Sequence, residues 1–190
     1  MNSERLRLFV AADLPPDLLA DLDESLASLR SRSEVASARW TVPASQHVTL
    51  KFLGWVDAET VGPIVEALAT VASTHEPATI TVTGLGVFPS ERRARVLWAG
   101  LDDPAGLLTA LASELDPALE PLGFEPETRA FTPHLTLARF KPPASVAGVL
   151  FEVPGVAQPS FEVDGVHLYR SHLHPKGARY EILNSFDLGS

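Results

Sequence analysis

The sequence predicts an α+β fold made of two similar lobes, in which antiparallel sheets line a central cleft and the helices lie outside. Two short runs carry the same polar pair in the same apolar setting, HVTLKFLG at 47–54 and HLTLARF at 134–140. Each run follows a helix-like segment and precedes sheet-like segments. This repetition indicates two related halves that face each other.

The composition is that of a folded protein with one substantial core. The chain has 190 residues, of which 45% are hydrophobic, and no apolar run approaches the roughly 18–20 residues that a membrane helix needs. The N-terminus lacks the pattern of a signal peptide. Because the chain has no cysteine, disulfides, thiolate metal ligands and cysteine nucleophiles are excluded. We expect a cytoplasmic protein, without membrane contact or a stable protein partner.

The net charge of -9 argues against sequence-independent binding of long nucleic acid, which depends on neutralising many phosphates at once. The charge is uneven, however, because the second half of the chain contains several basic clusters. They comprise Arg92, Arg93, Arg95, Arg139, Lys141, Arg170, Lys176 and Arg179. A locally positive cleft that holds a small phosphate therefore fits the sequence.

The first half reads as strand, helix, strand, helix. Residues 6–14 form an apolar, β-rich run that two prolines end, and 17–30 has leucines close to helical spacing. A strand over 46–55 and a helix over 57–73 follow. Asp57 is the predicted cap of that helix, although a Gly-Pro pair near its start can shift it.

The next part reads as two strands, at 78–88 and 93–101, joined by a polar turn and followed by a helix at 104–121. Pro117 is expected to kink this helix or end it early.

The last part contains a strand near 131–140, a stretch at 142–159 rich in Pro, Ala and Gly, and two strands at 161–171 and 179–188. Their connection, 172–178, has Pro and Gly where a hairpin needs them. Since no linker interrupts the chain, we expect one domain, 1–190, of two interleaved lobes.

Strand alternation separates two faces in each repeated run. His47, Thr49 and Lys51 are predicted to share one face, and Val48, Leu50 and Phe52 the opposite, apolar one. The second run repeats the division. There His134 and Thr136 share the polar face. Each lobe is therefore expected to present an imidazole beside a hydroxyl.

Two such pairs suit in-line displacement at phosphorus. One imidazole removes a proton from the attacking oxygen and the other delivers one to the leaving oxygen, since histidine titrates near pH 6.5. The two threonine hydroxyls can donate hydrogen bonds to the non-bridging oxygens. The pattern itself leaves open which histidine is the acid.

Other chemistries fit the sequence less well. Each repeated strand offers a metal only one nitrogen ligand and no adjacent carboxylate, so we predict neither a metal nor another cofactor. There is no G-x-S-x-G elbow of a serine hydrolase. The G-x-G at 84–86 lacks the third glycine of a dinucleotide site.

The chain resembles the 2H phosphoesterase superfamily, and within it the bacterial and archaeal RNA 2′,3′-cyclic phosphodiesterases, also known as 2′-5′ RNA ligases. The resemblance extends over nearly the whole chain and keeps the family's order. It rests on RLFVAADLP, HVTLKFLG, RARVLWAGL, FTPHLTLARF and LYRSHLHPKGARYEIL.

This resemblance implies a bilobal fold with pseudo-two-fold symmetry and metal-independent hydrolysis of a 2′,3′-cyclic phosphate to a 2′-phosphomonoester. By position, His47 would be the proton donor and His134 the proton acceptor that activates water. Thr49 and Thr136 would hold the phosphate. The implied ligands are RNA ends or nucleotides with a 2′,3′-cyclic phosphate.

Four further residues are candidates for substrate binding. Lys51 is predicted to lie on the cleft face, and Arg95 to approach the phosphate or else lie exposed at a strand edge. Arg139 matches the family's arginine, but alternation places it opposite His134 unless the strand ends or bulges. Tyr180 is the preferred aromatic face for stacking a base.

The remaining aromatic and histidine candidates are assigned structural roles. Core packing is expected for most of the other aromatic residues considered, Phe9, Trp40 and Phe88. His172 and His174 form an H-x-H pair at a hairpin end and are predicted to be solvated. His75 and His167 have no partner in the sequence pattern.

Two alternatives to hydrolysis stay open. The first is the joining of tRNA halves through a 2′-5′ linkage, in which a 5′-hydroxyl replaces water. The second is a non-catalytic module that binds phosphorylated nucleotide ends. The sequence does not distinguish tRNA fragments, short oligonucleotides, cyclic nucleotides and ADP-ribose derivatives as substrates.

Overall fold

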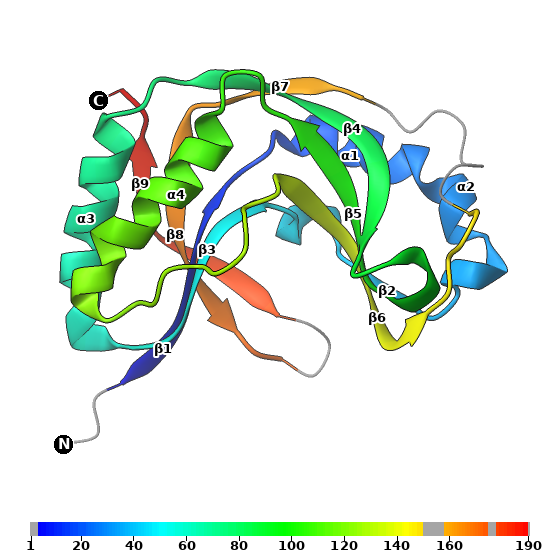
Figure 1. Cartoon of the computed structure of the whole chain (residues 1–190), viewed down its shortest axis with the longest axis horizontal. Helices are drawn as coiled ribbons and strands as arrows, with labels where there is room; N and C mark the ends of the chain where they lie inside the picture. Colours follow the sequence, from blue (N-terminus) through cyan, green and yellow to red (C-terminus); the bar gives the residue numbers. More distant parts are fainter. Residues whose placement is uncertain (1–3, 150–157, 175–177, 190) are drawn as a thin grey trace.

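A computed structural model describes residues 4–149, 158–174 and 178–189, which form two antiparallel sheets with helices around them (Figure 1). The first sheet has the strand order β3-β1-β8-β9 and the second the order β2-β6-β5-β4-β7. The first sheet consists of β1 (Arg5–Ala12), β3 (Val48–Asp57), β8 (Gly165–His172) and β9 (Arg179–Asp187). The second consists of β2 (Ala38–Trp40), β4 (Ala78–Phe88), β5 (Ala94–Asp102), β6 (His134–Ala144) and β7 (Ser160–Val163).

The two sheets repeat one strand order. In each, the strand that carries a His-x-Thr run pairs antiparallel with the preceding long strand, β3 with β1 and β6 with β5. One helix-containing segment links the members of each pair. The second sheet adds β2 at its edge, so that β6 is flanked on both sides whereas β3 is an edge strand. This repeated arrangement is the two-lobed α+β fold that the sequence predicts.

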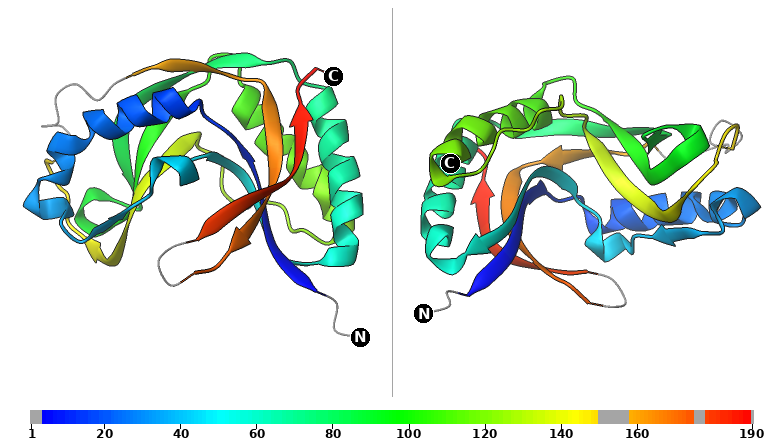
Figure 2. Two further views of the ribbon diagram at one scale, coloured as in Figure 1. Left: turned by 180° about the vertical axis from the view of Figure 1, so that it is seen from behind. Right: turned by 60° about the horizontal axis from the view of Figure 1, so that its bottom comes forward.

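The helices cover the outer surfaces and connect the lobes. They are α1 (Pro16–Ser25), α2 (Ala27–Arg30), α3 (Val61–Ser73) and α4 (Leu107–Leu119). Short 3-10 turns occur at η1 (Ser33–Val35), η2 (Pro43–Ser45), η3 (Ala58–Thr60), η4 (Glu91–Arg93) and η5 (Glu120–Leu122). The helix α4 follows a strand of the second sheet but packs with α3 on the first, whereas α1 and α2 lie beside the second sheet (Figures 1 and 2).

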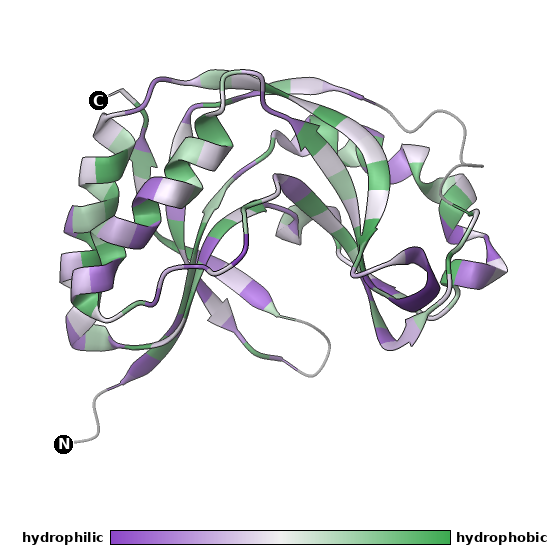
Figure 3. Ribbon diagram, in the orientation of Figure 1, coloured by the Kyte–Doolittle hydropathy of each residue, from purple (hydrophilic) through white to green (hydrophobic). Residues whose placement is uncertain are grey.

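One continuous core of buried apolar side chains extends through both sheets and the longer helices. Leu8 of β1, Leu22 of α1, Leu68 of α3, Leu97 of β5 and Leu111 of α4 are each at most 1% exposed. Polar and apolar residues alternate around α3 and α4 (Figure 3). Burying one such leucine contributes about 1.5–3 kcal/mol, which accounts for the leucine spacing of these helices.

The three predicted helices differ from the observed ones in their bounds. The segment 17–30 divides into α1 and α2, which separate at Leu26. The predicted cap at Asp57 is wrong, because β3 continues to this residue through its pairing with Arg5, and α3 begins only at Val61.

The helix predicted over 104–121 is α4, which begins at Leu107. The Asp103 carboxylate accepts hydrogen bonds from the backbone N–H of Leu107 at 2.9 Å and of Leu108 at 2.8 Å, and so satisfies donors at the start of the helix. Pro117 lies inside the last turn. The helix ends two residues later and continues as a 3-10 turn.

The strand predicted over 161–171 is in fact two strands that belong to different sheets. It is interrupted at Asp164, so that β7 pairs with β4 and β8 pairs with β1. The strands β8 and β9 pair antiparallel, as expected for a hairpin. Of the predicted loops, 150–157 and 175–177 lie outside the described residues. No helix in the described part of the chain is long and apolar enough to cross a membrane.

Candidate active site

A β-bulge in the first His-x-Thr strand changes which residues face inward. Ala11 of β1 pairs with Thr49, but Val10 pairs with Lys51, so Leu50 is an additional residue on β3. A bulge of this kind shifts the alternation by one position. Leu50 and Lys51 are consequently both buried, and Phe52 moves to the opposite face.

The prediction that Lys51 faces the cleft is therefore wrong. The side chain is 2% exposed, and its ammonium donates hydrogen bonds to the Asp116 carboxylate of α4 and to the Glu125 carbonyl, the latter at 3.0 Å. The expected core position of Phe52 is wrong for the same reason, since this side chain is 54% exposed. Lys51 thus holds α4 against β3.

A matching bulge occurs in the second His-x-Thr strand. Trp98 of β5 pairs with Thr136, whereas Leu97 pairs with Ala138, so Leu137 is the additional residue. Regular alternation would have placed Arg139 opposite His134. The bulge instead brings Arg139 to the face that Thr136 occupies.

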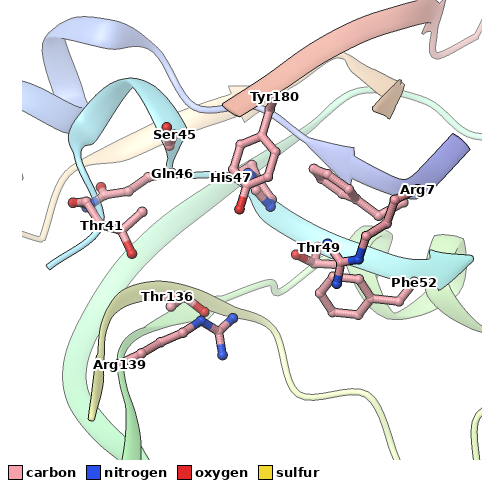
Figure 4. Close-up of a pocket in the computed structure, with 11 residues that line it drawn as sticks. Arg7, Thr41, Ser45, Gln46, His47, Thr49, Phe52, Thr136, Arg139 and Tyr180 are labelled. Carbon is pink, nitrogen blue, oxygen red and sulfur yellow. The ribbon is translucent and has the colours of Figure 1, made fainter. Parts of the chain in front are cut away.

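A cavity of about 400 Å³, the central cavity, lies between the two bulged strands (Figure 4). Four predicted residues line it together with His47: Thr49, Thr136, Arg139 and Tyr180. The other residues that line it are Arg7, Phe9, Thr41, Ser45, Gln46 and Phe52.

Besides Lys51, two predicted site residues do not line the central cavity. His134 lies two residues before Thr136 on β6. Both side chains are partly buried, whereas their neighbours Leu135 and Leu137 are fully buried. Arg95 of β5 is exposed and lies outside the cavity. Of the two roles considered for Arg95, the exposed surface position is the one observed.

His47 is held in an aromatic setting. Its ring stacks on Phe9 at 4.7 Å between centroids, and Tyr180 approaches edge-on at 5.1 Å. Burial lowers the pKa of His47 to about 4, and the charge of Arg139 acts in the same direction. The Asp13 carboxylate opposes this shift. His47 is therefore neutral at pH 7 in the free protein.

His134 has a different set of neighbours. Phe88 lies edge-on at 5.2 Å and Trp98 at 6.3 Å between ring centroids. Its Nδ1–H donates to the carbonyl of Thr132 at 2.7 Å, which leaves Nε2 as the basic nitrogen. Burial lowers the pKa of His134, and Arg139 contributes to the shift. The Arg139 guanidinium therefore lowers the pKa of both histidines.

The central cavity is rich in unused hydrogen-bond donors. Within the described part of the chain, Thr49 Oγ1, Thr136 Oγ1 and the Arg139 guanidinium have no hydrogen-bond or ion-pair partner. Among the residues that the structure describes, Arg7 donates a side-chain hydrogen bond only to Ser171 Oγ, at 3.1 Å. A protein of net charge -9 thus keeps two arginines in one cavity without a carboxylate partner from those residues, which favours binding of an anion.

Arg7 and Asp13 were not predicted. Arg7 lies two residues before Phe9 on β1, so strand alternation places both side chains on the same face. This spacing is the feature of the sequence from which Arg7 could have been predicted. Asp13 lies just beyond the end of β1, where the Tyr169 hydroxyl donates to both its carboxylate oxygens at 2.7 Å. Burial and this hydrogen bond raise the pKa of Tyr169. No local sequence pattern pairs these two residues, which are 156 positions apart.

The other histidines make local contacts away from the central cavity. His172 pairs with Glu181 at 2.7 Å and His75 with Glu114 at 3.1 Å. His167 Nδ1 contacts Ser185 Oγ at 2.9 Å. His174 is exposed. Among the described residues, no three His, Asp or Glu side chains are grouped as metal ligands.

The remaining aromatic residues and the G-x-G motif have packing roles. Trp40 lies under the Arg30 guanidinium at 4.8 Å, and Phe88 packs on Trp98 at 5.1 Å. A Cβ at Gly86 would lie 2.2 Å from the Trp98 ring. This glycine therefore allows the indole to cross β4, which explains its presence without a dinucleotide.

The sequence matches the family model described as LigT like Phosphoesterase over residues 13–98 and 100–180. The chain belongs to this family of LigT-like phosphoesterases. The match covers well over half of the chain, and its two segments each contain one of the His-x-Thr strands.

Two curated relatives of this LigT-like phosphoesterase align over their whole length. A protein of Methanothermobacter thermautotrophicus named RNA 2′,3′-cyclic phosphodiesterase is 33% identical, with 97% of this chain and all of the relative covered. One of Archaeoglobus fulgidus with the same name is 34% identical, with coverage of 96% and 100%.

Solved structures of LigT-like proteins share the fold. The crystal structure of TT0787 from Thermus thermophilus has a TM-score of 0.82 at 30% identity, covering 97% of this chain and 98% of that one. E. coli LigT complexed with 3′-AMP has a TM-score of 0.77 at 28% identity, with coverage of 98% and 100%. The superposition extends over both lobes.

Proposed function

We propose that this LigT-like phosphoesterase hydrolyses the 2′,3′-cyclic phosphate of an RNA end or nucleotide to a 2′-phosphomonoester, without a metal cofactor. One observation carries the proposal: the two bulged strands bring His47, two threonine hydroxyls and the Arg139 guanidinium to one cavity, and neither hydroxyl nor the guanidinium has a partner among the described residues. The names of the curated relatives support the choice of a cyclic phosphate.

In this mechanism the phosphate is bound between the lobes. Thr49 donates from β3 and Thr136 from β6 to the two non-bridging oxygens, where negative charge increases in the transition state. Arg139 adds a charge-assisted hydrogen bond. Because these donors have no other partner within the described residues, they need not break a bond to bind the phosphate.

His134, which does not itself line the central cavity but lies two residues before the cavity-lining Thr136 on β6, is the proposed base. Its Nδ1–H is committed to the Thr132 carbonyl, and its lowered pKa keeps Nε2 unprotonated at neutral pH. Nε2 takes a proton from water as the water oxygen forms a bond to phosphorus. The imidazolium that forms then carries the proton that the water has lost.

His47 is the proposed acid. The bond between phosphorus and O3′ breaks, and O3′ takes a proton from His47, so that the product keeps its phosphate on the 2′ oxygen. Since His47 is neutral in the free protein, it must gain this proton when the anionic substrate binds. The Asp13 carboxylate favours that gain, because it raises the pKa of His47.

Aromatic side chains at the cavity suit a nucleotide. Tyr180 and Phe52 are 37% and 54% exposed and line the central cavity from β9 and β3, the two edge strands of the first sheet. Exposed aromatic faces stack on unpaired bases.

We also propose that the two interleaved lobes act as one unit, and that the protein works in the cytoplasm.

The test is product analysis with 2′,3′-cyclic AMP in the presence of EDTA. We expect 2′-AMP as the product, with water supplying the new phosphate oxygen. Formation of 3′-AMP would contradict the assigned leaving group, and binding without turnover would favour a non-catalytic module. Addition of an RNA with a 5′-hydroxyl end tests for ligation, in which this hydroxyl replaces water and a 2′-5′ linkage is the product.

A further inference from the structure

A second cavity of about 660 Å³, the side cavity, adjoins the central cavity. The two meet at Ser45, Gln46, His47 and Tyr180, which line both. The far wall of the side cavity is largely apolar and comes from α1, its preceding turn and β9. It includes Leu14, Pro16, Leu19 and Ile182.

The two cavities differ in charge. The central cavity is lined by Arg7 and Arg139 and, among the described residues, by no carboxylate. The side cavity is lined by the Asp13 carboxylate and, within the same part of the chain, by no lysine or arginine. A phosphate therefore belongs in the central cavity, whereas the side cavity suits an uncharged group with apolar faces.

The lining of the side cavity suits a planar heterocycle. Tyr169 and Tyr180 give it aromatic surface beside the aliphatic wall, and Asp13 gives it a hydrogen-bond acceptor. The Tyr169 hydroxyl is already committed to Asp13. Apolar surface with a few acceptors is the chemistry that binds a nucleobase through its faces and its N–H groups.

Gln46 gives a second indication at the boundary between the cavities. It is 7% exposed, and its Nε2 donates to the Thr41 carbonyl at 3.3 Å. Its Oε1 is buried and has no hydrogen-bond partner within the described residues. A buried acceptor left without a donor is destabilising. A ligand that crosses from one cavity to the other can supply that donor.

We propose that the side cavity holds the nucleobase of the penultimate nucleotide of an RNA whose terminal cyclic phosphate lies in the central cavity. This inference rests on the proposed function and adds a substrate class to it. In this arrangement the base of the terminal nucleotide lies against Tyr180 or Phe52 in the central cavity, so a cyclic mononucleotide leaves the side cavity unfilled. The protein therefore selects oligonucleotide ends over cyclic mononucleotides.

The first experiment compares kcat/KM for 2′,3′-cyclic AMP and for the diadenylate ApA with a 2′,3′-cyclic end. One stacked base contributes about 1–3 kcal/mol, which is roughly a 5- to 150-fold preference for the dinucleotide. A dinucleotide with an abasic first ribose is expected to lose most of that preference. Equal values for the first two substrates, or full preference with the abasic one, would overturn the inference.

The second experiment fills the side cavity. Ile182→Trp places an indole at its rim, where Ile182 is 47% exposed, and is expected to reduce the dinucleotide preference at least fivefold. Val42→Trp is the matched control, since Val42 is 62% exposed and lines neither cavity. The inference fails if both variants keep the preference. Thermal unfolding of both proteins checks that they are folded.

The two proposals fail in different ways. Absence of hydrolysis of every cyclic substrate would count against the proposed function, and the side cavity would then be tested by calorimetric binding of ApA 2′-phosphate against 2′-AMP. Tighter binding of the dinucleotide, lost in Ile182→Trp, would support the base site. Hydrolysis of all substrates at equal kcat/KM would reject the base site and keep the proposed function.

Discussion

The two His-x-Thr strands have the same backbone plan but different neighbours. Both bulge three residues after the histidine, at Leu50 in β3 and at Leu137 in β6. The bulge brings the fifth residue after each histidine to the central cavity, Phe52 in one lobe and Arg139 in the other. The repeat therefore sets the shape of the site, and the residues that differ give each half its chemistry.

The electrostatic difference between the halves bears on the acid and the base. Asp13 favours the protonated form of His47. The pKa of His134 is lowered, and among the described residues only the bond to the Thr132 carbonyl, and no carboxylate, opposes that shift. Arg139 disfavours protonation of both. We infer that the Asp13 carboxylate breaks the pseudo-symmetry of the two lobes. His47 is then the histidine that gains a proton when the substrate binds.

Replacing either histidine is expected to have the largest effect. His47→Gln and His134→Gln should each lower kcat by roughly 10²- to 10⁴-fold, the usual contribution of a positioned acid or base. The double variant should lose little more, because the two act in one step. His172→Gln, at an exposed histidine, is the control. Near wild-type hydrolysis by either single variant would disprove the acid–base pair.

The next test concerns Lys51, whose position after the bulge in β3 corresponds to that of Ala138 after the bulge in β6. Asp116→Asn should lower the free energy of unfolding by about 3 kcal/mol, because it leaves the Lys51 ammonium, 1% exposed, without its carboxylate.

Lys51→Met should cost less, about 1 kcal/mol, since the Asp116 side chain is 19% exposed and keeps its bond from the Glu127 N–H at 3.0 Å. Urea denaturation measures both costs. Loss of kcat in a stably folded Lys51→Met would show that the lysine acts on the substrate after all.

The threonines test whether both lobes hold the phosphate. Thr49→Val and Thr136→Val should each lower kcat by roughly 10²-fold, as expected for one donor to a charge that develops in the transition state. Thr79→Val, at an exposed position of β4, is the control. A large effect at only one position would mean that the phosphate is held by a single lobe.

The last test concerns the pH dependence of stability. The folded protein holds the pKa of His47 at about 4, whereas the unfolded chain titrates near 6.5. The unfolded state therefore binds more protons in this window, and stability falls as the pH drops from 6.5 to 4, by roughly 2–3 kcal/mol.

His47→Gln should flatten that part of the stability curve in urea denaturation at pH 7 and pH 4.5. An unchanged loss between these pH values would show that His47 does not titrate as its burial implies. His172→Gln again serves as the control, because His172 is 46% exposed beside Glu181.

Much of the architecture could be predicted from local patterns. Alternation placed the histidines and threonines on the polar faces of their strands, and leucine spacing located the longer helices. These predictions succeeded because side-chain direction within a strand, or on a helix, repeats with a fixed period. The sequence by itself also predicted the two lobes, since the His-x-Thr run occurs twice with similar surroundings.

The tertiary structure decided which residues face the cavity and which charged partners they have, because the regular side-chain period of strands and helices does not determine these. The bulges depend on how β1 and β5 pair with the His-x-Thr strands, and these contacts reverse the expected positions of Lys51 and Phe52 and bring in Arg139. Asp116 and Asp13 acquire their partners across 65 and 156 positions. Local sequence determines where a side chain points along a regular strand, but burial and charge pairing are properties of segments that meet only in the folded chain.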